Sequence, residues 1–288
     1  MGLISLSAFL FMQAAHAEDV PPTVQPPQLP GGFGLSLGPS IIRVAGKPGE
    51  TQQATVRVSN QSKDPIDLIV EVYDLGNRVT PAGELERIFP AAGTLPHSCA
   101  SSVQLPASQI TVEAGAFKDV TLLVAIPPEL SGGRAAVVFF RGTPKAPEAT
   151  EKAADVPGKA TATVQIQPRI GVLVFVEALG TLKRTGKIED FKVTPPAEGE
   201  PLRMDYVFEN TGNVDVLLAG TFYMLSESNA LAAKGSINSI RTFPGDRGNS
   251  KTIWEGALDP GRYHLVASFE LGPDSQEVVV QESDVVVA

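Results

Sequence analysis

The stretch Lys159 to Ala178, KATATVQIQPRIGVLVFVEA, decides how this chain folds. Its even-numbered positions are apolar with one exception, Pro168, and a period of two is typical of a β-strand. The odd positions are polar in the first half, whereas Leu173 and Phe175 are apolar, so only the second half can be buried on both faces. Because proline has no backbone N–H, the pattern predicts an edge strand from Lys159 to Gln167 and a core strand after it.

The predicted edge strand is the main candidate for a binding site. A strand at a sheet edge has unpaired N–H and C=O groups that a second polypeptide can use. The apolar residues Ala160, Ala162, Val164 and Ile166 share one face of this edge, and we expect them to form a partner-binding strand. An ordinary, solvent-facing edge of a sandwich is the alternative. A transmembrane helix is excluded because polar and charged residues interrupt the apolar run.

The composition indicates an all-β protein. A chain of 288 residues is long enough for one to three domains. Its 24 prolines and 27 glycines separate short runs rich in Val, Ile and Thr, and helix-favouring runs are scarce. The net charge of −9, without a cluster of Lys and Arg, argues against nucleic acid or an anionic membrane surface as a partner.

The strand signals fall into two sets, separated by the connector Leu179 to Gly186. They predict two tandem immunoglobulin-like β-sandwiches, at residues 34–180 and 181–288. In the second set, Leu258 to Tyr263 is a turn that delivers a tyrosine to a strand, as in a tyrosine corner. Two segments are not assigned to strands, the excursion Gly76 to Gln104 and the polar link Gly142 to Gly158. The predicted strands are 35–44, 51–59, 66–75, 109–112, 117–126, 134–141, 169–178, 187–194, 202–209, 214–225, 235–240, 250–254, 263–271 and 277–287.

The N-terminus predicts export. The apolar run Leu3 to Met12 is followed by Ala15-His16-Ala17, which indicates a signal peptide at residues 1–17. Residues 18–33 are a proline-rich leader. Cys99 is the only cysteine, so no intramolecular disulfide can form, and an exported protein of this kind fits a bacterial periplasm or cell surface.

The segments of the first sandwich resemble, in their order, the N-terminal domain of periplasmic pilus-assembly chaperones, the PapD-like fold. The matching segments are GLSLGPSIIRV, PGETQQATVRVSN, IDLIVEVYDL, VEAGAFKDVTLLVAIPP and GGRAAVVFFRGTPK. The segments FENTGNVDV and WEGALDPGRYHL resemble immunoglobulin-like modules of bacterial exported proteins. The chaperone resemblance implies that the edge strand is lent to a client subunit and that two basic residues hold the terminal carboxylate of the client. Arg43 matches the first basic position; alignment on the strand end puts Gly171 at the second, and a register shift gives Arg169.

Enzymatic and metal chemistry find little support in the sequence. Gly34 to Gly38 fits the G-x-S-x-G pattern of hydrolases, but that motif requires a strand before it and a helix after it, and here a strand follows. His97 and Cys99 are two residues apart, yet no second pair completes a zinc site, and we expect no cofactor or metal. We expect Cys99 to be a half-buried thiol in a loop and His264 to be a surface histidine. The two arginines, Arg43 and Arg169, can also be simply solvated or ion-paired.

The sequence therefore leaves two functions open. The first is an exported, non-enzymatic chaperone-like or protein-binding module that pairs its edge strand with an envelope or surface protein. The alternative is a structural scaffold or adhesin-type protein of the cell envelope or surface, in which the tandem sandwiches act as spacers.

Overall fold

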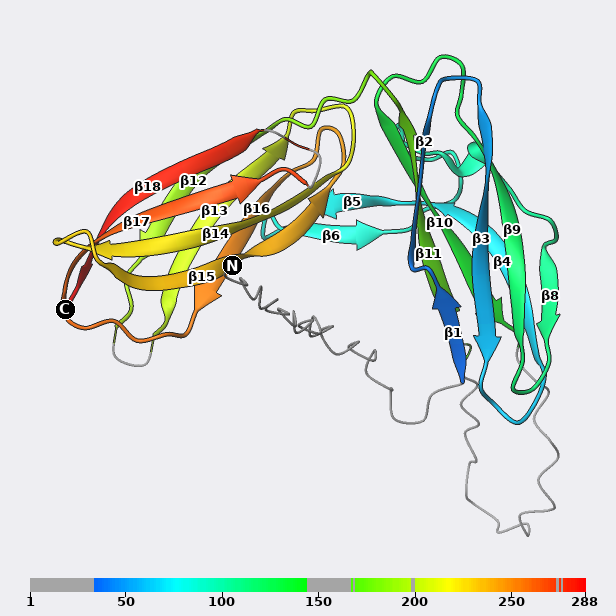
Figure 1. Cartoon of the computed structure of the whole chain (residues 1–288), viewed down its shortest axis with the longest axis horizontal. Helices are drawn as coiled ribbons and strands as arrows, with labels where there is room; N and C mark the ends of the chain where they lie inside the picture. Colours follow the sequence, from blue (N-terminus) through cyan, green and yellow to red (C-terminus); the bar gives the residue numbers. More distant parts are fainter. Residues whose placement is uncertain (1–33, 144–166, 168, 198–199, 273–274, 276) are drawn as a thin grey trace, which may run out of the picture. The chain divides into compact units, whose positions relative to one another are not determined.

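The first sandwich consists of two sheets that face each other across a hydrophobic core (Figure 1). The computed structural model describes residues 34–143, 167, 169–197, 200–272, 275 and 277–288. Side chains such as Val56, Leu122, Phe140 and Val174 are fully buried between the sheets. The five-stranded sheet has the order β2 (Ile41–Gly46), β11 (Arg169–Ala178), β10 (Gly133–Gly142), β4 (Ile66–Asp74) and β8 (Gln109–Val112). The four-stranded sheet has the order β1 (Leu35–Gly38), β3 (Thr51–Asn60), β9 (Phe117–Ala125) and β7 (Val103–Gln104).

The second sandwich has its own core, in which the alternating apolar residues of both sheets meet. Leu202, Phe208, Phe222 and Phe269 are fully buried there. The three-stranded sheet has the order β12 (Gly186–Thr194), β13 (Leu202–Asn210) and β16 (Arg247–Trp254). The four-stranded sheet has the order β15 (Leu231–Thr242), β14 (Val216–Ser226), β17 (Gly261–Glu270) and β18 (Val278–Val287). The all-β prediction of two sandwiches is thus confirmed, and both lie within one compact unit, residues 33–288.

The prediction of one strand over residues 35–44 is wrong, because the chain changes sheets at Pro39. The segment β1 pairs antiparallel with β3, whereas β2 pairs parallel with β11 in the opposite sheet. A proline cannot donate to a ladder, so the strand breaks there and the next residues join the other sheet. This switch leaves β2 beside only part of β11.

The unassigned excursion Gly76 to Gln104 contains a hairpin and a short 3-10 helix. The hairpin pairs β5 (Gly76–Val79) with β6 (Leu85–Ile88), and η1 (Ala100–Ser102) precedes β7. The fully buried carboxylate of Asp74 holds the returning chain: it accepts hydrogen bonds from the backbone N–H of Gly93 at 2.9 Å and of Leu95 at 2.7 Å, and from the Ser98 hydroxyl. Burial opposes ionisation of Asp74, but these bonds stabilise the carboxylate and lower its pKa.

The two sandwiches use the same buried asparagine turn. The Asn60 amide donates to the carbonyl of Asp64 at 2.8 Å, and the Asn210 amide donates to the carbonyl of Val214 at 3.0 Å. Gly212 in the second turn does not need a positive φ; a Cβ there would lie 2.1 Å from the carbonyl oxygen of Lys183, so a close backbone approach requires glycine. Each turn thus ends one strand by satisfying its backbone groups with a side chain.

Candidate protein-binding edge and its neighbours

The edge of β11 is only half covered by β2. The parallel pairing between the two strands begins at Leu173 opposite Ile41, and the Leu173 N–H donates to the carbonyl of Ser40 at 3.0 Å. On its other side, β11 pairs with β10 along its length, from Arg169 to Glu177. In the described part of the chain, no strand pairs with the outer edge of β11 before Leu173.

The open part of this edge presents backbone donors and acceptors. Backbone groups of a strand point alternately to its two sides. Because the Leu173 N–H points toward β2, the N–H and C=O groups of Gly171 and Arg169 point the same way, where β2 is absent. The predicted partner-strand residues upstream lie outside the described residues. These are Ala160, Ala162, Val164 and Ile166.

An aromatic shelf lies on the sheet face beside the open edge. It consists of Tyr73 on β4, Phe139 on β10 and Phe89 after β6, with edge-to-face ring contacts at centroid distances of 5.7 and 5.2 Å. The Arg169 guanidinium lies over this shelf, 3.6 Å from the Phe139 ring centroid and 4.5 Å from that of Tyr73. Gly171 leaves room for the shelf, since a Cβ there would lie 2.8 Å from a Phe139 ring carbon. The open edge therefore lies beside a cluster of aromatic rings, with the Arg169 guanidinium over two of them.

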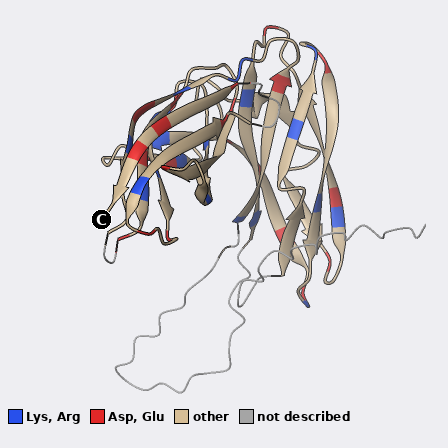
Figure 2. Cartoon of the chain, turned by 60° about the vertical axis from the view of Figure 1, so that its left-hand side comes forward, with Lys and Arg blue, Asp and Glu red and all other residues tan. Residues whose placement is uncertain are grey.

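No described residue balances the positive charge of Arg169. Its direct cross-strand neighbour on β10 is Arg141, a like charge. The guanidinium of Arg141 donates to both carboxylate oxygens of Glu71, at 3.2 and 3.3 Å, and this pairing raises the pKa of Arg141. Arg169 forms no ion pair within the described residues, although acidic and basic residues are interspersed along the strands (Figure 2). Among the described residues, therefore, no carboxylate neutralises the positive charge of Arg169 beside the open edge.

Arg43 lies in a different environment from Arg169. Its guanidinium donates to both oxygens of Asp215, at 3.0 and 3.1 Å, and also bonds Glu177. Burial opposes the charge of Arg43, but the hydrogen bonds and charges of Asp215 and Glu177 raise its pKa. These two carboxylates are themselves buried and are also bound by Arg241 and Arg184.

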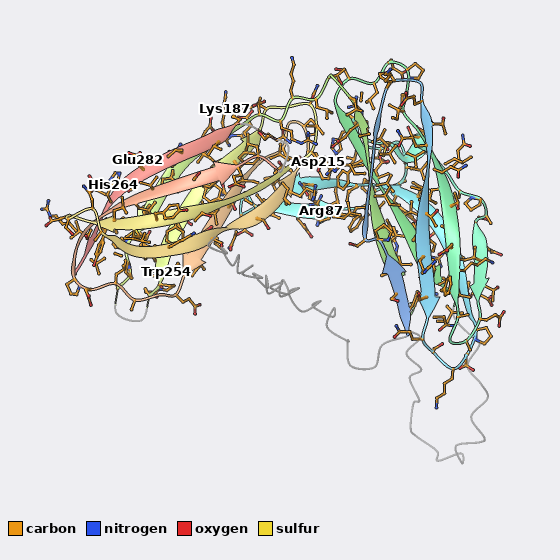
Figure 3. All side chains as sticks on the ribbon, in the orientation of Figure 1. Arg87, Lys187, Asp215, Trp254, His264 and Glu282 are labelled. Atoms are coloured by element: carbon orange, nitrogen blue, oxygen red, sulfur yellow. The ribbon has the colours of Figure 1, made fainter. Side chains whose placement is uncertain are left out.

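The structure does not bring together the two arginines expected to form a carboxylate clamp. Arg43 is in register with Phe175, six positions after Arg169 on β11. At about 3.3 Å per residue, the two backbone positions are about 20 Å apart. One carboxylate cannot bridge them. Arg43 instead belongs to a network between the sandwiches, because Asp215 and Arg241 belong to the second sandwich (Asp215 is labelled in Figure 3).

Phe243 forms a second contact between the sandwiches, which sequence reasoning missed. It follows β15, is 1% exposed and packs with Leu75, Ala135 and Phe175 of the first sandwich. His97 stacks on its ring at 4.9 Å between centroids, and the guanidinium of Arg87 (labelled in Figure 3) lies 5.1 Å from the ring centroid. The only signal in the sequence is a large aromatic residue immediately before a Pro-Gly turn.

Burial favours the neutral form of His97 in this contact. Its Nε2 atom is buried without a hydrogen-bond partner in the described structure. Burial lowers its pKa; the charge of Arg134 acts in the same direction, whereas Asp246 and Asp74 act against it. The second buried nitrogen without a partner among the described residues is Nη1 of Arg87.

The tip of the β5–β6 hairpin forms a third contact. The Asn249 N–H on β16 donates to the carbonyl of Gly83 at 2.7 Å, and its side-chain amide donates to that of Ala82 at 2.9 Å. Glu84 and Asn249 form a parallel β-bridge, and Lys251 lies 3.5 Å from Glu84. Gly83 has φ +79°, and a Cβ there would lie 2.5 Å from the Asn249 side chain. Both the backbone conformation and the lack of space therefore require glycine. The hairpin therefore covers part of the β16 edge.

The other residues singled out in the sequence have structural environments. Ser36 lies within β1 and is followed by β2, so it lacks the turn-and-helix context of a nucleophile elbow. The prediction that Cys99 is half-buried is wrong: it is 1% exposed, and burial raises the pKa of its thiol strongly. His264 is a surface residue, as predicted, and lies against Asp284 and Glu282 of β18 (His264 and Glu282 are labelled in Figure 3). Tyr263 donates from its hydroxyl to the carbonyl of Asp259 at 2.8 Å, which confirms the predicted tyrosine corner.

Within the described ranges, no helix has the length and apolar character that crossing a bilayer requires. The same residues contain no cluster of three or more His, Cys, Asp or Glu side chains that could hold a metal ion.

Comparisons with known proteins give matches among solved structures only. No protein-family model matches the chain, and no curated protein does. The class 5 fimbrial chaperone CfaA is 14% identical, with 86% of this chain and 98% of that chain covered and a TM-score of 0.44. The YadV chaperone is 9% identical over 88% and 100% of the two chains, with a TM-score of 0.44. The Escherichia coli chaperone DraB is 12% identical over 89% and 97%, with a TM-score of 0.37.

Proposed function

We propose that this chain is an exported, non-enzymatic protein-binding module of chaperone type that pairs the open edge of β11 with an extended segment of an envelope or surface protein. The observation that carries the proposal is the half-covered edge: β2 pairs with β11 only from Leu173 onward. A strand edge with free N–H and C=O groups next to an apolar face is the surface used in β-strand addition. The chaperone role is that of the similar structures named above; the open edge is a feature of this chain.

The proposal extends upstream into the predicted edge strand. Ala160, Ala162, Val164 and Ile166 would continue the same edge and supply alternating apolar side chains to the partner. It also includes a signal peptide at residues 1–17, a leader at 18–33, domains at 34–180 and 181–288, and a periplasmic or cell-surface location.

Two pairs of variants test the edge. Replacing Arg169 with proline removes an outward N–H at the first residue of β11, a position that tolerates proline, whereas Arg169→Gln removes the charge and keeps the N–H. The double variant Val164→Asp with Ile166→Asp tests the upstream extension. Its matched control is Val278→Asp with Val280→Asp, which alters two half-exposed valines at the same spacing on another edge strand, β18.

The measurement is photocrosslinking in the source cells, with the crosslinker at position 170, followed by identification of the adducts. We expect the same envelope protein to be lost from adducts of Arg169→Pro and of the Val164/Ile166 variant, and retained in those of the β18 control. Equal crosslinking in all variants, with circular dichroism showing all folded, would refute edge pairing.

The scaffold function remains the second candidate, and a specific observation favours it. The contacts that hold the two sandwiches together include the Arg43–Asp215 ion pair, the buried Phe243 ring and the hairpin bridge to Asn249. A spacer needs such rigidity, whereas a binding edge does not. Recovery of no specific adduct from the β11 edge, with stable incorporation of the chain into the cell envelope, would support the scaffold.

A further inference from the structure

The lone guanidinium of Arg169 indicates what the partner strand must carry. We propose that Arg169 recognises an acidic side chain, Asp or Glu, on the strand that pairs with β11, at the position directly opposite. This inference rests on the proposed edge pairing and adds a chemical requirement for the partner. It is drawn from the charge balance at the edge: Arg141 beside Arg169 already has Glu71, and Arg169 has no carboxylate among the described residues.

The same arrangement occurs in complete form elsewhere in the chain. Arg57 on β3 lies 4.1 Å from the centroid of the Phe117 ring and directly opposite Asp119 on β9. The guanidinium donates to both carboxylate oxygens of Asp119, at 2.8 Å each, and this pairing raises the pKa of Arg57 and lowers that of Asp119. An arginine over an aromatic ring with a cross-strand carboxylate is thus an arrangement that this fold already builds.

At Arg169 the arginine and the aromatic rings are present, but no described residue supplies the cross-strand carboxylate. Its guanidinium is planar, always charged and held over Phe139 and Tyr73, so its N–H donors are oriented in advance. Arg141 faces it from the strand on its other side, and a like charge directly opposite is destabilising. A carboxylate from a new strand would offset this repulsion and take up the guanidinium donors.

The strand β2 fixes where the acidic residue must stand. Because the Leu173 N–H is already bonded to Ser40, a partner strand cannot extend along β11 past Val172. The partner residue opposite Val172 is therefore the last of the paired segment, and the residue opposite Arg169 is the fourth from that end. The partner residue opposite Gly171 is two positions nearer this end, and its side chain lies on the same face of the sheet. It would lie next to the Phe139 ring, so an apolar side chain is favoured there.

Synthetic peptides provide the probe. Each has about ten residues, the length of these strands, alternates Val and Thr, has blocked ends, and carries lysines at the far end for solubility. One series places Asp fourth from the N-terminal end and another places it fourth from the C-terminal end, so that both strand directions are sampled. Matched peptides have Asn instead of Asp, and a further Asn peptide keeps a free terminal carboxylate.

Binding is measured by calorimetry, and pairing by protection of the Gly171 amide from hydrogen exchange. We expect the Asp peptide of one series to bind about two- to fivefold more tightly than its Asn counterpart, the range of a solvent-exposed ion pair. The variant Arg169→Gln should abolish this preference, and Arg169→Lys should retain part of it. The matched control Arg57→Gln, which alters the arginine that already has its carboxylate, should leave the preference unchanged.

The outcomes separate this inference from the proposed function. If all peptides protect the Gly171 amide but Asp and Asn bind equally, edge pairing stands and acidic recognition by Arg169 is wrong. A preference that survives Arg169→Gln, or that belongs only to the free terminal carboxylate, also overturns the inference. If no peptide protects Gly171, both the inference and the edge pairing fail.

Discussion

Replacing Phe243 with alanine should weaken the coupling between the two sandwiches rather than either core. The ring belongs to the second sandwich, but its neighbours Leu75, Ala135 and Phe175 belong to the first. Removing it would leave a cavity at the contact and would leave the His97 ring without its stacking partner. The hairpin bridge and the Arg43–Asp215 ion pair would remain.

The expected magnitude follows from burial. Truncation of a fully buried phenylalanine to alanine costs about 3 to 5 kcal/mol. We expect about 3 kcal/mol, because Phe243 lies in a turn whose neighbours can partly close the cavity. For a compact unit of this size, such a loss corresponds to a decrease in melting temperature of about 6 to 12 °C.

The single tryptophan, Trp254, makes the assay specific, because it reports on the second sandwich alone. Urea unfolding is followed by Trp254 fluorescence and, in parallel, by circular dichroism, which averages both sandwiches. In Phe243→Ala the midpoint of the fluorescence transition should move to a lower urea concentration and should no longer coincide with the transition seen by circular dichroism. The control is Phe117→Ala, whose ring is 58% exposed, with an expected change below about 1 kcal/mol. A Phe243→Ala effect no larger than this control would refute the reasoning.

Three other predictions follow from buried or charged groups. Asp215→Asn should destabilise the protein by about 2 kcal/mol in urea unfolding, because Arg43 loses a buried carboxylate but keeps Glu177; a change below about 0.5 kcal/mol would contradict this. Burial lowers the pKa of His97, so its contribution to stability is complete above the unfolded value of about 6.5 and is lost as pH falls below it. His97→Phe should remove this loss of stability below about pH 6.5, whereas His264, whose pKa is raised by its hydrogen bond to a carboxylate, should show the opposite trend. The buried Cys99 thiol should not react with a maleimide in the folded protein and should react in denaturant; rapid labelling of the native chain would show that the site opens.

Much of the fold could be predicted because most strands bury one regular face. The segments 109–112 and 169–178 have the same bounds in the sequence prediction and in the structure, since apolar alternation there coincides with the core. The break at Pro39 was missed because the apolar residues continue on both sides of it. Alternation reports burial, and it does not report which sheet a strand joins.

The contacts between the sandwiches could not be predicted. The hairpin strands, GNRV and LERI, contribute to neither core and so lack a strong apolar pattern. Arg43 and Asp215 are 172 positions apart, and nothing in a single sequence links them. Near the candidate site, the strand 169–178 could be predicted, but the aromatic shelf beside Arg169 depends on three segments that the fold brings together.

The docked hairpin has a practical consequence for anyone who divides this protein into fragments. A fragment that starts near residue 181 would lose the hairpin tip that bonds to β16. The unpaired edge of β16 would then be exposed, and exposed strand edges promote aggregation of β-proteins. The fragment would also expose the apolar Phe243 ring to water. Such a fragment should precipitate or self-associate unless the strand margin is blocked by charge and the phenylalanine is replaced.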